Sequence, residues 1–201
     1  MWIDPAGSDA VLVLAHGAGS GMGSPFMAGF SEEIGRLGVA TLRFEFPYMQ
    51  AGRRAPDQPQ VLLDSWREAF AEGVDGAAGR PVFAGGKSMG GRIASMAAAE
   101  GMPAAGLVFL GYPLHPPGRP EKIRDAHLPD VPVPMLFLQG SRDAFARPDL
   151  LAAVIARLGP RAEYVEVAGG DHSFRVPGGP RDARVIGASL AEPAATFIRA
   201  V

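Results

Sequence analysis

The fold is decided by residues 82–91, Val82-Phe83-Ala84-Gly85-Gly86-Lys87-Ser88-Met89-Gly90-Gly91. The stretch begins as an apolar run typical of a buried strand and leads into helical spacing over residues 89–100. Between the two lies G-x-S-x-G, the pattern of a sharp strand-to-helix turn that projects a serine hydroxyl above a sheet. Side chains two residues before and after the serine would collide in such a turn, so Gly86 and Gly90 fit it sterically. The stretch therefore predicts Ser88 as a nucleophile.

Similar short apolar runs recur along the chain and alternate with segments of helical spacing. Strands are predicted over 11–15, 39–46, 82–84, 107–110, 135–138 and 164–167. Helices are predicted after Ser24-Pro25 and over 61–74, 89–100, 148–158 and 184–199, the last bent or broken at Pro193. This order predicts an α/β fold: a three-layer αβα sandwich with a mostly parallel sheet of about six strands, in one domain over residues 1–201.

Composition excludes several classes of protein. The 201 residues carry a net charge of −2, with 20% charged and 47% hydrophobic residues, which argues against disorder. No basic run is present, so no nucleic-acid partner is expected. The absence of cysteine excludes disulfides, thiolate metal sites and a cysteine nucleophile. No signal-peptide pattern or membrane-spanning run is visible, which predicts a cytoplasmic protein without a membrane partner. The sequence leaves the oligomeric state open.

A base and an acid for the serine are expected on loops at the carboxyl ends of later strands, because ligands bind at that edge of a parallel sheet. Asp143 follows the predicted strand over 135–138, and His172 follows the strand over 164–167. The chain order Ser…Asp…His fits the strand–turn–helix context of Ser88. Asp171 is a poor rival, because adjacent side chains in a loop rarely align as acid and base. We predict Ser88, Asp143 and His172 as the catalytic residues.

The residues around this constellation complete the predicted site. The backbone N–H groups of Met89 and Ala18 are expected to form the oxyanion hole, with Gly19 as the alternative to Ala18. Residues 111–134 contain seven prolines and little periodicity, which indicates a long excursion used for binding or as a lid. His16 is expected to be structural and His127 to lie on the surface. The predicted substrate-binding residues are Tyr48, Tyr112, Leu114, His115 and Phe174.

Three other interpretations were weighed. A phosphate-binding G-x-x-x-x-G-K-[ST] loop would need glycine where Pro81 stands. A short-chain dehydrogenase is suggested by the glycines of 17–23 and by Glu45, but its Tyr-x-x-x-Lys pair is absent, since Phe83 and Gly118 precede the only two lysines at that spacing. A non-catalytic scaffold would have no reason to keep Ser88, Asp143 and His172. No HExxH spacing exists, so neither a metal nor a cofactor is expected.

Six blocks of the sequence carry a resemblance to a known family: 16–19, 43–48, 86–91, 111–118, 139–143 and 171–174. The chain resembles the small bacterial α/β-hydrolases of dienelactone-hydrolase-like type, in the branch that is similar to the testis-expressed and NSL-complex subunit proteins. The resemblance implies a minimal α/β-hydrolase fold without a large cap, with Ser88 as nucleophile, Asp143 as acid and His172 as base. The chain departs from the full fold in that its two leading antiparallel strands are missing or vestigial.

Together these features predict a serine hydrolase that cleaves carboxylic esters with small or short acyl chains through an acyl-Ser88 intermediate. Dienelactone hydrolases proper use a cysteine nucleophile, so their substrate does not carry over to this chain. The expected partner is a small-molecule ester. Esterase, thioesterase, amidase and peptidase activities share this acyl-enzyme chemistry, and the sequence leaves the choice among them open.

Overall fold

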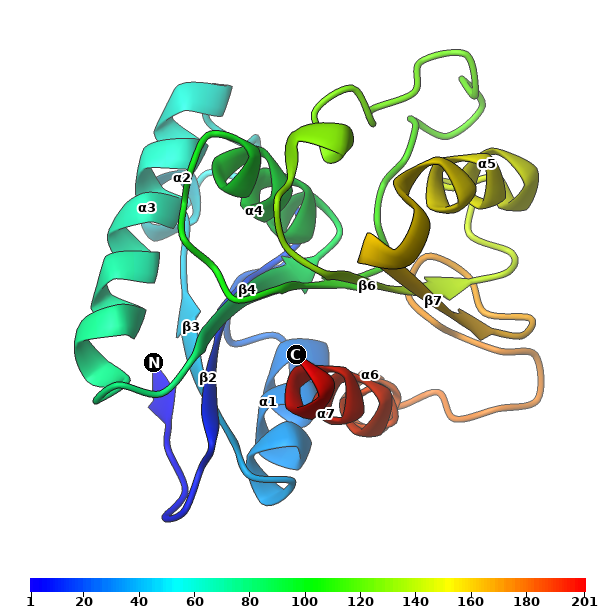
Figure 1. The fold of residues 1–201 in the computed structure, drawn as a ribbon. Helices are drawn as coiled ribbons and strands as arrows, with labels where there is room; N and C mark the ends of the chain where they lie inside the picture. The colour runs from blue at the N-terminus through cyan, green and yellow to red at the C-terminus, as the bar shows by residue number, and fades with distance from the viewer.

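A seven-stranded sheet runs through the middle of the molecule in the order β1-β3-β2-β4-β5-β6-β7 (Figure 1). The structure is a computed structural model that describes residues 1–201. β1 is antiparallel to its neighbour β3, and all other neighbours are parallel. The strands span Trp2–Ile3 (β1), Ala10–Ala15 (β2), Val39–Phe44 (β3), Val82–Lys87 (β4), Leu107–Leu110 (β5), Met135–Gly140 (β6) and Ala162–Val167 (β7).

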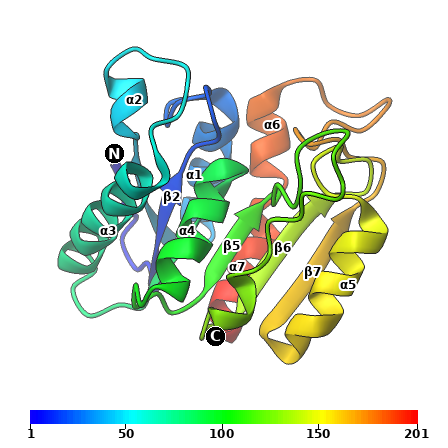
Figure 2. The ribbon, with the colours of Figure 1, turned by 90° about the horizontal axis from the view of Figure 1, so that it is seen from above.

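The central strands are apolar because helices cover both faces of the sheet. Every residue of β2, β5 and β6 is buried, as the near-continuous apolar runs predict. On one face lie α3 (Pro59–Gly76), α4 (Met89–Ala99) and α5 (Pro148–Leu158). On the other lie α1 (Pro25–Arg36), α6 (Ala183–Ala188) and α7 (Ala191–Ala200), so the molecule has three layers (Figure 2). Each face of the sheet has its own cluster of buried apolar side chains.

The helix boundaries follow local sequence signals, with one difference from the prediction. Ser24 caps α1 and its side chain accepts from the Met27 amide, with Pro25 as the first helical residue. The segment predicted as one helix over 184–199 is two helices that part at Ser189 and Leu190, before Pro193. Pro193 instead lies in the first turn of α7, where a missing N–H costs no helical hydrogen bond.

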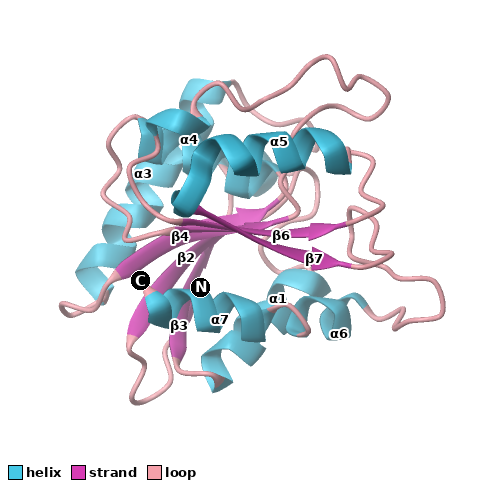
Figure 3. Ribbon diagram, turned by 45° about the vertical axis from the view of Figure 1, so that its right-hand side comes forward, coloured by secondary structure: helices cyan, strands magenta, loops and turns pink.

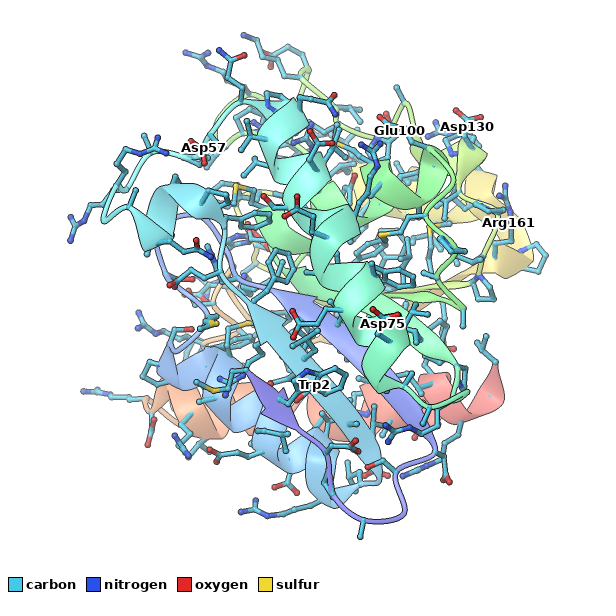
Figure 4. The ribbon with its side chains drawn as sticks, turned by 90° about the vertical axis from the view of Figure 1, so that its left-hand side faces the viewer. Trp2, Asp57, Asp75, Glu100, Asp130 and Arg161 are labelled. Carbon is cyan, nitrogen blue, oxygen red and sulfur yellow. The ribbon has the colours of Figure 1, made fainter.

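Several short elements escaped the sequence pattern. They are β1, the helix α2 (Pro47–Gln50) and the 3-10 turns Leu128–Asp130 and Gly159–Arg161. β1 has two residues, and it pairs Trp2 with Leu42 of β3. Figure 4 shows Trp2 beside the C-terminal half of α3, where Asp75 lies, and its indole N–H donates to Glu72 (3.2 Å). A single short strand thus stands where the resemblance predicted missing or vestigial leading strands.

The parallel strands end at one edge of the sheet, where loops collect beyond β6 and β7 (Figure 3). Residues 111–134 contain no strand and only a 3-10 turn. They were expected to bind ligand or form a lid. The buried side chains of Leu114, Leu128 and Val131 tie this segment into the core, while Pro113 and Arg124 line a cavity described below. No helix of the protein is long and apolar enough to cross a membrane.

Candidate active site

Ser88 lies at the junction of β4 and α4 in a strained backbone conformation. Its φ of 51° and ψ of −116° place a non-glycine residue at positive φ, which is costly and typical of sites where function demands it. Close approach to β2 makes the turn possible. A Cβ on Gly86 would come within 2.2 Å of the Ala15 carbonyl oxygen, and one on Gly90 within 2.4 Å of the same atom. The glycines are therefore required by a neighbouring strand, not by a clash between their own side chains.

Ser88, His172 and Asp143 form a hydrogen-bonded chain although they come from three separate loops. Nε2 of His172 lies 2.8 Å from Oγ of Ser88, and Nδ1 lies 2.7 Å from Oδ2 of Asp143. An ionised carboxylate can only accept, so Nδ1 donates to Asp143. Nε2 is then unprotonated and accepts from the Ser88 hydroxyl. The structure thus brings together the three residues predicted as catalytic.

Asp143 is held by three donors in a buried position. Its side chain is 0% exposed, and it accepts from His172, from the Gln139 side-chain amide (2.5 Å) and from the Phe145 backbone N–H (2.7 Å). Gln139 is itself oriented, because its Oε1 accepts from the Tyr112 amide (2.7 Å). These bonds fix both carboxylate oxygens and compensate for burying the charge.

The loops after β6 and β7 are packed tightly enough to bring Asp143 and His172 together. A Cβ on Gly140 would lie 2.3 Å from the Gly170 carbonyl oxygen, so only glycine permits this contact. The Arg142 amide donates to the same oxygen (2.8 Å), and the Gly169 amide donates to Oγ of Ser141 (2.8 Å). The two loops form one hydrogen-bonded unit at the edge of the sheet.

The imidazole of His172 is oriented from two further sides. The Phe145 ring stacks on it, with centroids 4.1 Å apart and planes 29° apart. The ammonium of Lys87 donates to the His172 backbone carbonyl (2.7 Å) and lies over the Phe174 ring, 5.5 Å from its centroid. Burial lowers the pKa of Lys87 to about 8, against the opposing attraction of Asp143 and Asp171.

The amides expected to bind an oxyanion differ in whether they are already engaged. The Gly19 N–H donates to the Tyr48 hydroxyl (3.3 Å), so this amide is occupied. Ala18 borders both cavities beside Ser88, and Met89 begins α4 directly after Ser88. Helix N-terminal amides have no intrahelical partner and carry a partial positive charge. This arrangement favours Ala18 over Gly19, the alternative that the sequence left open.

Two cavities meet at Ser88, and Ala18 and Phe145 border both. The first, of about 360 Å³, lies between the loop after β2 and α6, and its lining includes Phe26, Lys87, His172 and Ile186. The second, of about 420 Å³, lies on the side of α3 and α4, and its lining includes Leu62, Met89, Arg92, Pro113 and Arg124.

The five residues predicted to bind substrate line neither cavity. All five are buried, because each packs in the layer beneath the site. The Tyr112 hydroxyl donates to the Arg124 carbonyl (2.7 Å), and Leu114 belongs to the core. Phe174 stacks behind Phe26, with centroids 6.0 Å apart. Tyr48 supports the loop after β2 through its bond to Gly19, and His115 is described below.

Two histidines serve as structural crosslinks with the same pattern of bonds. Nε2 of His16 accepts from the Phe46 amide (3.2 Å), and Nδ1 bonds the Gly17 carbonyl (2.8 Å). Nε2 of His115 accepts from the Arg147 amide (2.9 Å), and Nδ1 bonds the Pro116 carbonyl (2.9 Å). Burial lowers the pKa of His16. The expected structural role of His16 agrees with these bonds, whereas His115 was expected in the pocket and instead fastens the excursion to the loop after β6.

Three other residues weighed from the sequence also have defined partners. His127 was expected on the surface, but it is a half-buried residue of the excursion and its Nε2 bonds Oγ of Ser95 on α4 (2.8 Å). Oδ1 of Asp171 accepts from the Ser173 and Arg175 amides and so shapes its own loop. Glu45, considered for a dehydrogenase ribose, accepts from the Met22 amide (3.2 Å) and holds the glycine-rich loop.

Sequence reasoning missed several residues at the site. Gln139, Phe145 and Lys87 orient the acid and the base, and Arg92 and Arg124 line the second cavity. Arg92 had an available signal, because it follows Ser88 by one helical turn and so points to the same side. Phe145 had no such signal, since a lone aromatic in a polar loop does not show what it packs against. No cluster of three or more His, Cys, Asp or Glu side chains suited to a metal ion is present.

Comparisons with known proteins agree with this fold. Residues 8–196 match the family described as alpha/beta hydrolase domain. A structure of an alpha-beta serine hydrolase homologue from Coxiella burnetii superposes with a TM-score of 0.77 at 18% identity, covering 98% of this chain and 89% of that one. Dienelactone hydrolase from Anabaena variabilis gives a TM-score of 0.74 at 21% identity, with the same coverage, 98% and 89%. An α/β serine hydrolase without lid from Xanthomonas campestris gives 0.72 at 17% identity, covering 96% and 84%.

The fold and the family match define the class of protein: an α/β hydrolase built on a mostly parallel seven-stranded sheet with helices on both sides. The chain belongs to the alpha/beta hydrolase domain family. The expected fold class is thereby confirmed, with one strand more than the six expected because β1 adds a short edge strand.

Proposed function

We propose that this protein is a serine hydrolase that cleaves carboxylic esters through a covalent acyl-Ser88 intermediate. The observation that carries the proposal is the Ser88–His172–Asp143 chain, with distances of 2.8 and 2.7 Å, at a strained turn that opens into two cavities. A serine hydroxyl is a weak nucleophile alone and is activated by an adjacent oriented base.

The reaction follows from the direction of these hydrogen bonds. Nε2 of His172 takes the hydroxyl proton while Oγ of Ser88 attacks the ester carbonyl carbon, and Asp143 stabilises the imidazolium that forms. The oxyanion of the tetrahedral intermediate accepts from the amides of Met89 and Ala18. Cleavage of the C–O bond then returns the proton from Nε2 to the leaving alkoxide. Water repeats the sequence, releasing the carboxylic acid and restoring the Ser88 hydroxyl.

Small or short-chain esters fit the site best. The cavities of about 360 and 420 Å³ are each of the size that encloses a small molecule, and no cap domain covers them. We further propose that residues 1–201 form one domain and that the protein acts on a small-molecule substrate in the cytoplasm, without a nucleic-acid partner.

Labelling with a fluorophosphonate tests the proposal directly, because such probes trap an activated serine. The wild-type protein should be modified at Ser88, mapped by peptide mass spectrometry, and should hydrolyse short 4-nitrophenyl esters. Denatured protein serves as the control and should not react. Absence of both labelling and turnover would contradict a serine hydrolase and favour a non-catalytic scaffold. Faster turnover of thioesters or amides than of esters would mean that this other acyl donor, and not an ester, is the substrate class.

A further inference from the structure

The second cavity beside Ser88 contains two arginines whose charges have no counter-ion in the protein. Arg92 and Arg124 both line this cavity of about 420 Å³, together with Ser88 itself. None of the nine ion pairs of the protein involves either residue. Two guanidinium groups therefore face a space that also reaches the reacting serine.

Arg92 is held at a fixed distance along the helix from the nucleophile. Its amide donates to the Ser88 carbonyl (3.1 Å), so the two residues lie one turn apart on the same side of α4. Its Nε is buried and has no hydrogen-bond partner. A buried donor that is left unsatisfied is costly, and more so on a charged group. The Nη groups of Arg92 also make no hydrogen bond within the protein and are not among its buried unpaired atoms, so they are the atoms that a ligand in the cavity can reach.

The groups near Arg92 do not neutralise it. Burial and the neighbouring Arg124 lower the pKa of Arg92, while the Tyr112 phenol acts in the opposite sense. Arg92 in turn contributes to the lowered pKa of His127, which is thereby kept neutral. The one carboxylate on the cavity wall, Asp57, pairs through Oδ1 with Arg53 (2.6 Å), and its Oδ2 is buried without a partner, so Asp57 bonds neither Arg92 nor Arg124. Figure 4 shows Asp57 in the segment that leads into α3.

The first cavity lacks this character. Its single buried cation, Lys87, already donates to the His172 carbonyl and lies over two aromatic rings. Arg175 also lines this cavity, but it is exposed to solvent, where a charge contributes little to binding. Phe26 and Ile186 supply apolar surface opposite. The two sides of Ser88 thus differ in chemistry: one side suits an apolar group, and the other suits an anion with acceptor oxygens.

We infer that the cavity lined by Arg92 and Arg124 is a carboxylate-binding subsite, and that the preferred substrates are esters carrying a carboxylate on the portion that enters it. The inference rests on the proposed function, since it names the substrate class of the same serine. A carboxylate between two guanidinium groups accepts charge-assisted hydrogen bonds from their Nη–H groups. Planar guanidinium groups match carboxylate geometry better than a lysine ammonium would.

Matched ester pairs test the inference, and they distinguish a carboxylate on the acyl side from one on the alcohol side. The acyl-side pair is mono-4-nitrophenyl adipate and its methyl ester, methyl 4-nitrophenyl adipate. The alcohol-side pair is 4-acetoxybenzoate and methyl 4-acetoxybenzoate. The measured quantity is the ratio of kcat/KM for the anionic ester to that for its neutral partner, which cancels general losses of activity.

We expect this ratio to fall about tenfold or more in Arg92→Gln and in Arg124→Gln, in whichever pair places its carboxylate in the cavity. The matched control is Arg119→Gln, an exposed arginine in the same excursion that lines neither cavity, and its ratio should equal that of the wild type. An unchanged ratio in both arginine variants, for both pairs, would overturn the subsite while leaving the hydrolase intact.

Binding measured without turnover separates the two proposals. Calorimetric titration of Ser88→Ala protein with 4-acetoxybenzoate should give tighter binding than titration with its methyl ester, and Arg92→Gln in the same background should remove the difference. If the wild type cleaves no ester, the proposed function fails, yet this titration still decides the subsite. Equal binding of the acid and its methyl ester to both proteins would refute the subsite on its own.

Discussion

The protein contains two serine–histidine pairs whose serines lie at the start of α4 and within it, and only one pair has the features of a catalytic site. Ser88 precedes the first residue of α4 and lies 2.8 Å from Nε2 of His172, while Ser95 lies two turns further on and 2.8 Å from Nε2 of His127. The distances are equal. The direction of the hydrogen bonds differs, because Ser95 donates its one hydrogen to the Arg92 carbonyl (2.7 Å) and must accept from His127.

The comparison teaches that the third partner decides what a serine–histidine contact does. Asp143 takes the Nδ1 hydrogen of His172 and leaves Nε2 as the acceptor for Ser88. No carboxylate bonds Nδ1 of His127, and its Nε2 carries the hydrogen. Ser88 also has a positive φ and lies between two cavities, whereas Ser95 is buried within α4 and is not among the residues with positive φ. The second pair ties the excursion to α4.

Removing each serine in turn should give the largest contrast between the pairs. Ser88→Ala should lower kcat for a short 4-nitrophenyl ester by about 10⁶, as expected for a member of a triad that acts as a unit. Ser95→Ala should keep kcat within about twofold and lose about 1 kcal/mol of unfolding free energy, because a buried hydrogen bond is removed. Ester assays and urea denaturation measure the two effects. Comparable losses of activity in both variants would mean that the pairs are not distinct in function.

Changing the third partner should convert the first pair into one resembling the second. In Asp143→Asn the amide no longer fixes Nδ1 as the donor, so the imidazole can present Nε2–H to Ser88 and cannot accept its proton. We expect kcat to fall by about 10⁴, with a smaller change in KM, measured by steady-state ester hydrolysis. The matched control is Asp171→Asn, the neighbouring carboxylate that only shapes its loop. A loss of tenfold or less in Asp143→Asn would place the acid elsewhere.

The sequence predicted the fold, and it predicted Ser88, His172 and their third partner Asp143, because the signals of these features are local. Residues 82–91 contain both the strand and the glycines of the turn, and Asp143 and His172 follow recognisable strands. The chain order Ser…Asp…His then indicated which residue is the nucleophile, which the acid and which the base. The predicted bounds of two elements agree residue for residue with the structure: those of β5, 107–110, and those of α5, 148–158.

The pocket could not be predicted in the same way, because it depends on which side chains the tertiary packing leaves facing the cavity. Tyr48 and Tyr112 follow strands at the active edge, but both fold inward to support loops. Phe145 reaches the site from a polar loop, where a lone aromatic does not show what it packs against, and only Arg92, one helical turn after Ser88, had a signal in the sequence. His127 looks like a surface residue in a proline-rich segment, and its partner Ser95 lies 32 residues away.

Lys87 distinguishes the two pairs further, since it holds the His172 backbone and His127 has no such support. Burial lowers its pKa to about 8, below the ordinary value near 10.4, so the unfolded chain binds more protons between these values. The unfolding free energy should therefore gain up to about 1.4 kcal/mol per pH unit as pH rises from 8 towards 10. Urea denaturation at pH 8 and 9.5 should show this gain in the wild type and lose it in Lys87→Met. Equal gains in both proteins would assign the titration to another group.

His127 gives the smallest expected effect and sharpens the comparison from the acid side. Burial, aided by the charge of Arg92, lowers its pKa from an ordinary 6.5 to about 4. Between these values the unfolded chain takes up a proton that the folded one refuses, so stability falls as pH decreases from 6.5 to 4. His127→Gln should remove this slope of at most about 1.4 kcal/mol per pH unit.

Urea denaturation of wild type and His127→Gln at pH 7 and pH 5 measures the difference, and the lowered pKa of His16 cancels because both proteins retain it. A smaller loss of unfolding free energy in the variant would show that the Ser95 pair requires a neutral, hydrogen-donating imidazole. Parallel losses would mean that His127 titrates as freely as an exposed histidine. In that case burial and the charge of Arg92 would not hold His127 neutral, and the contrast with His172 would rest on Asp143 alone.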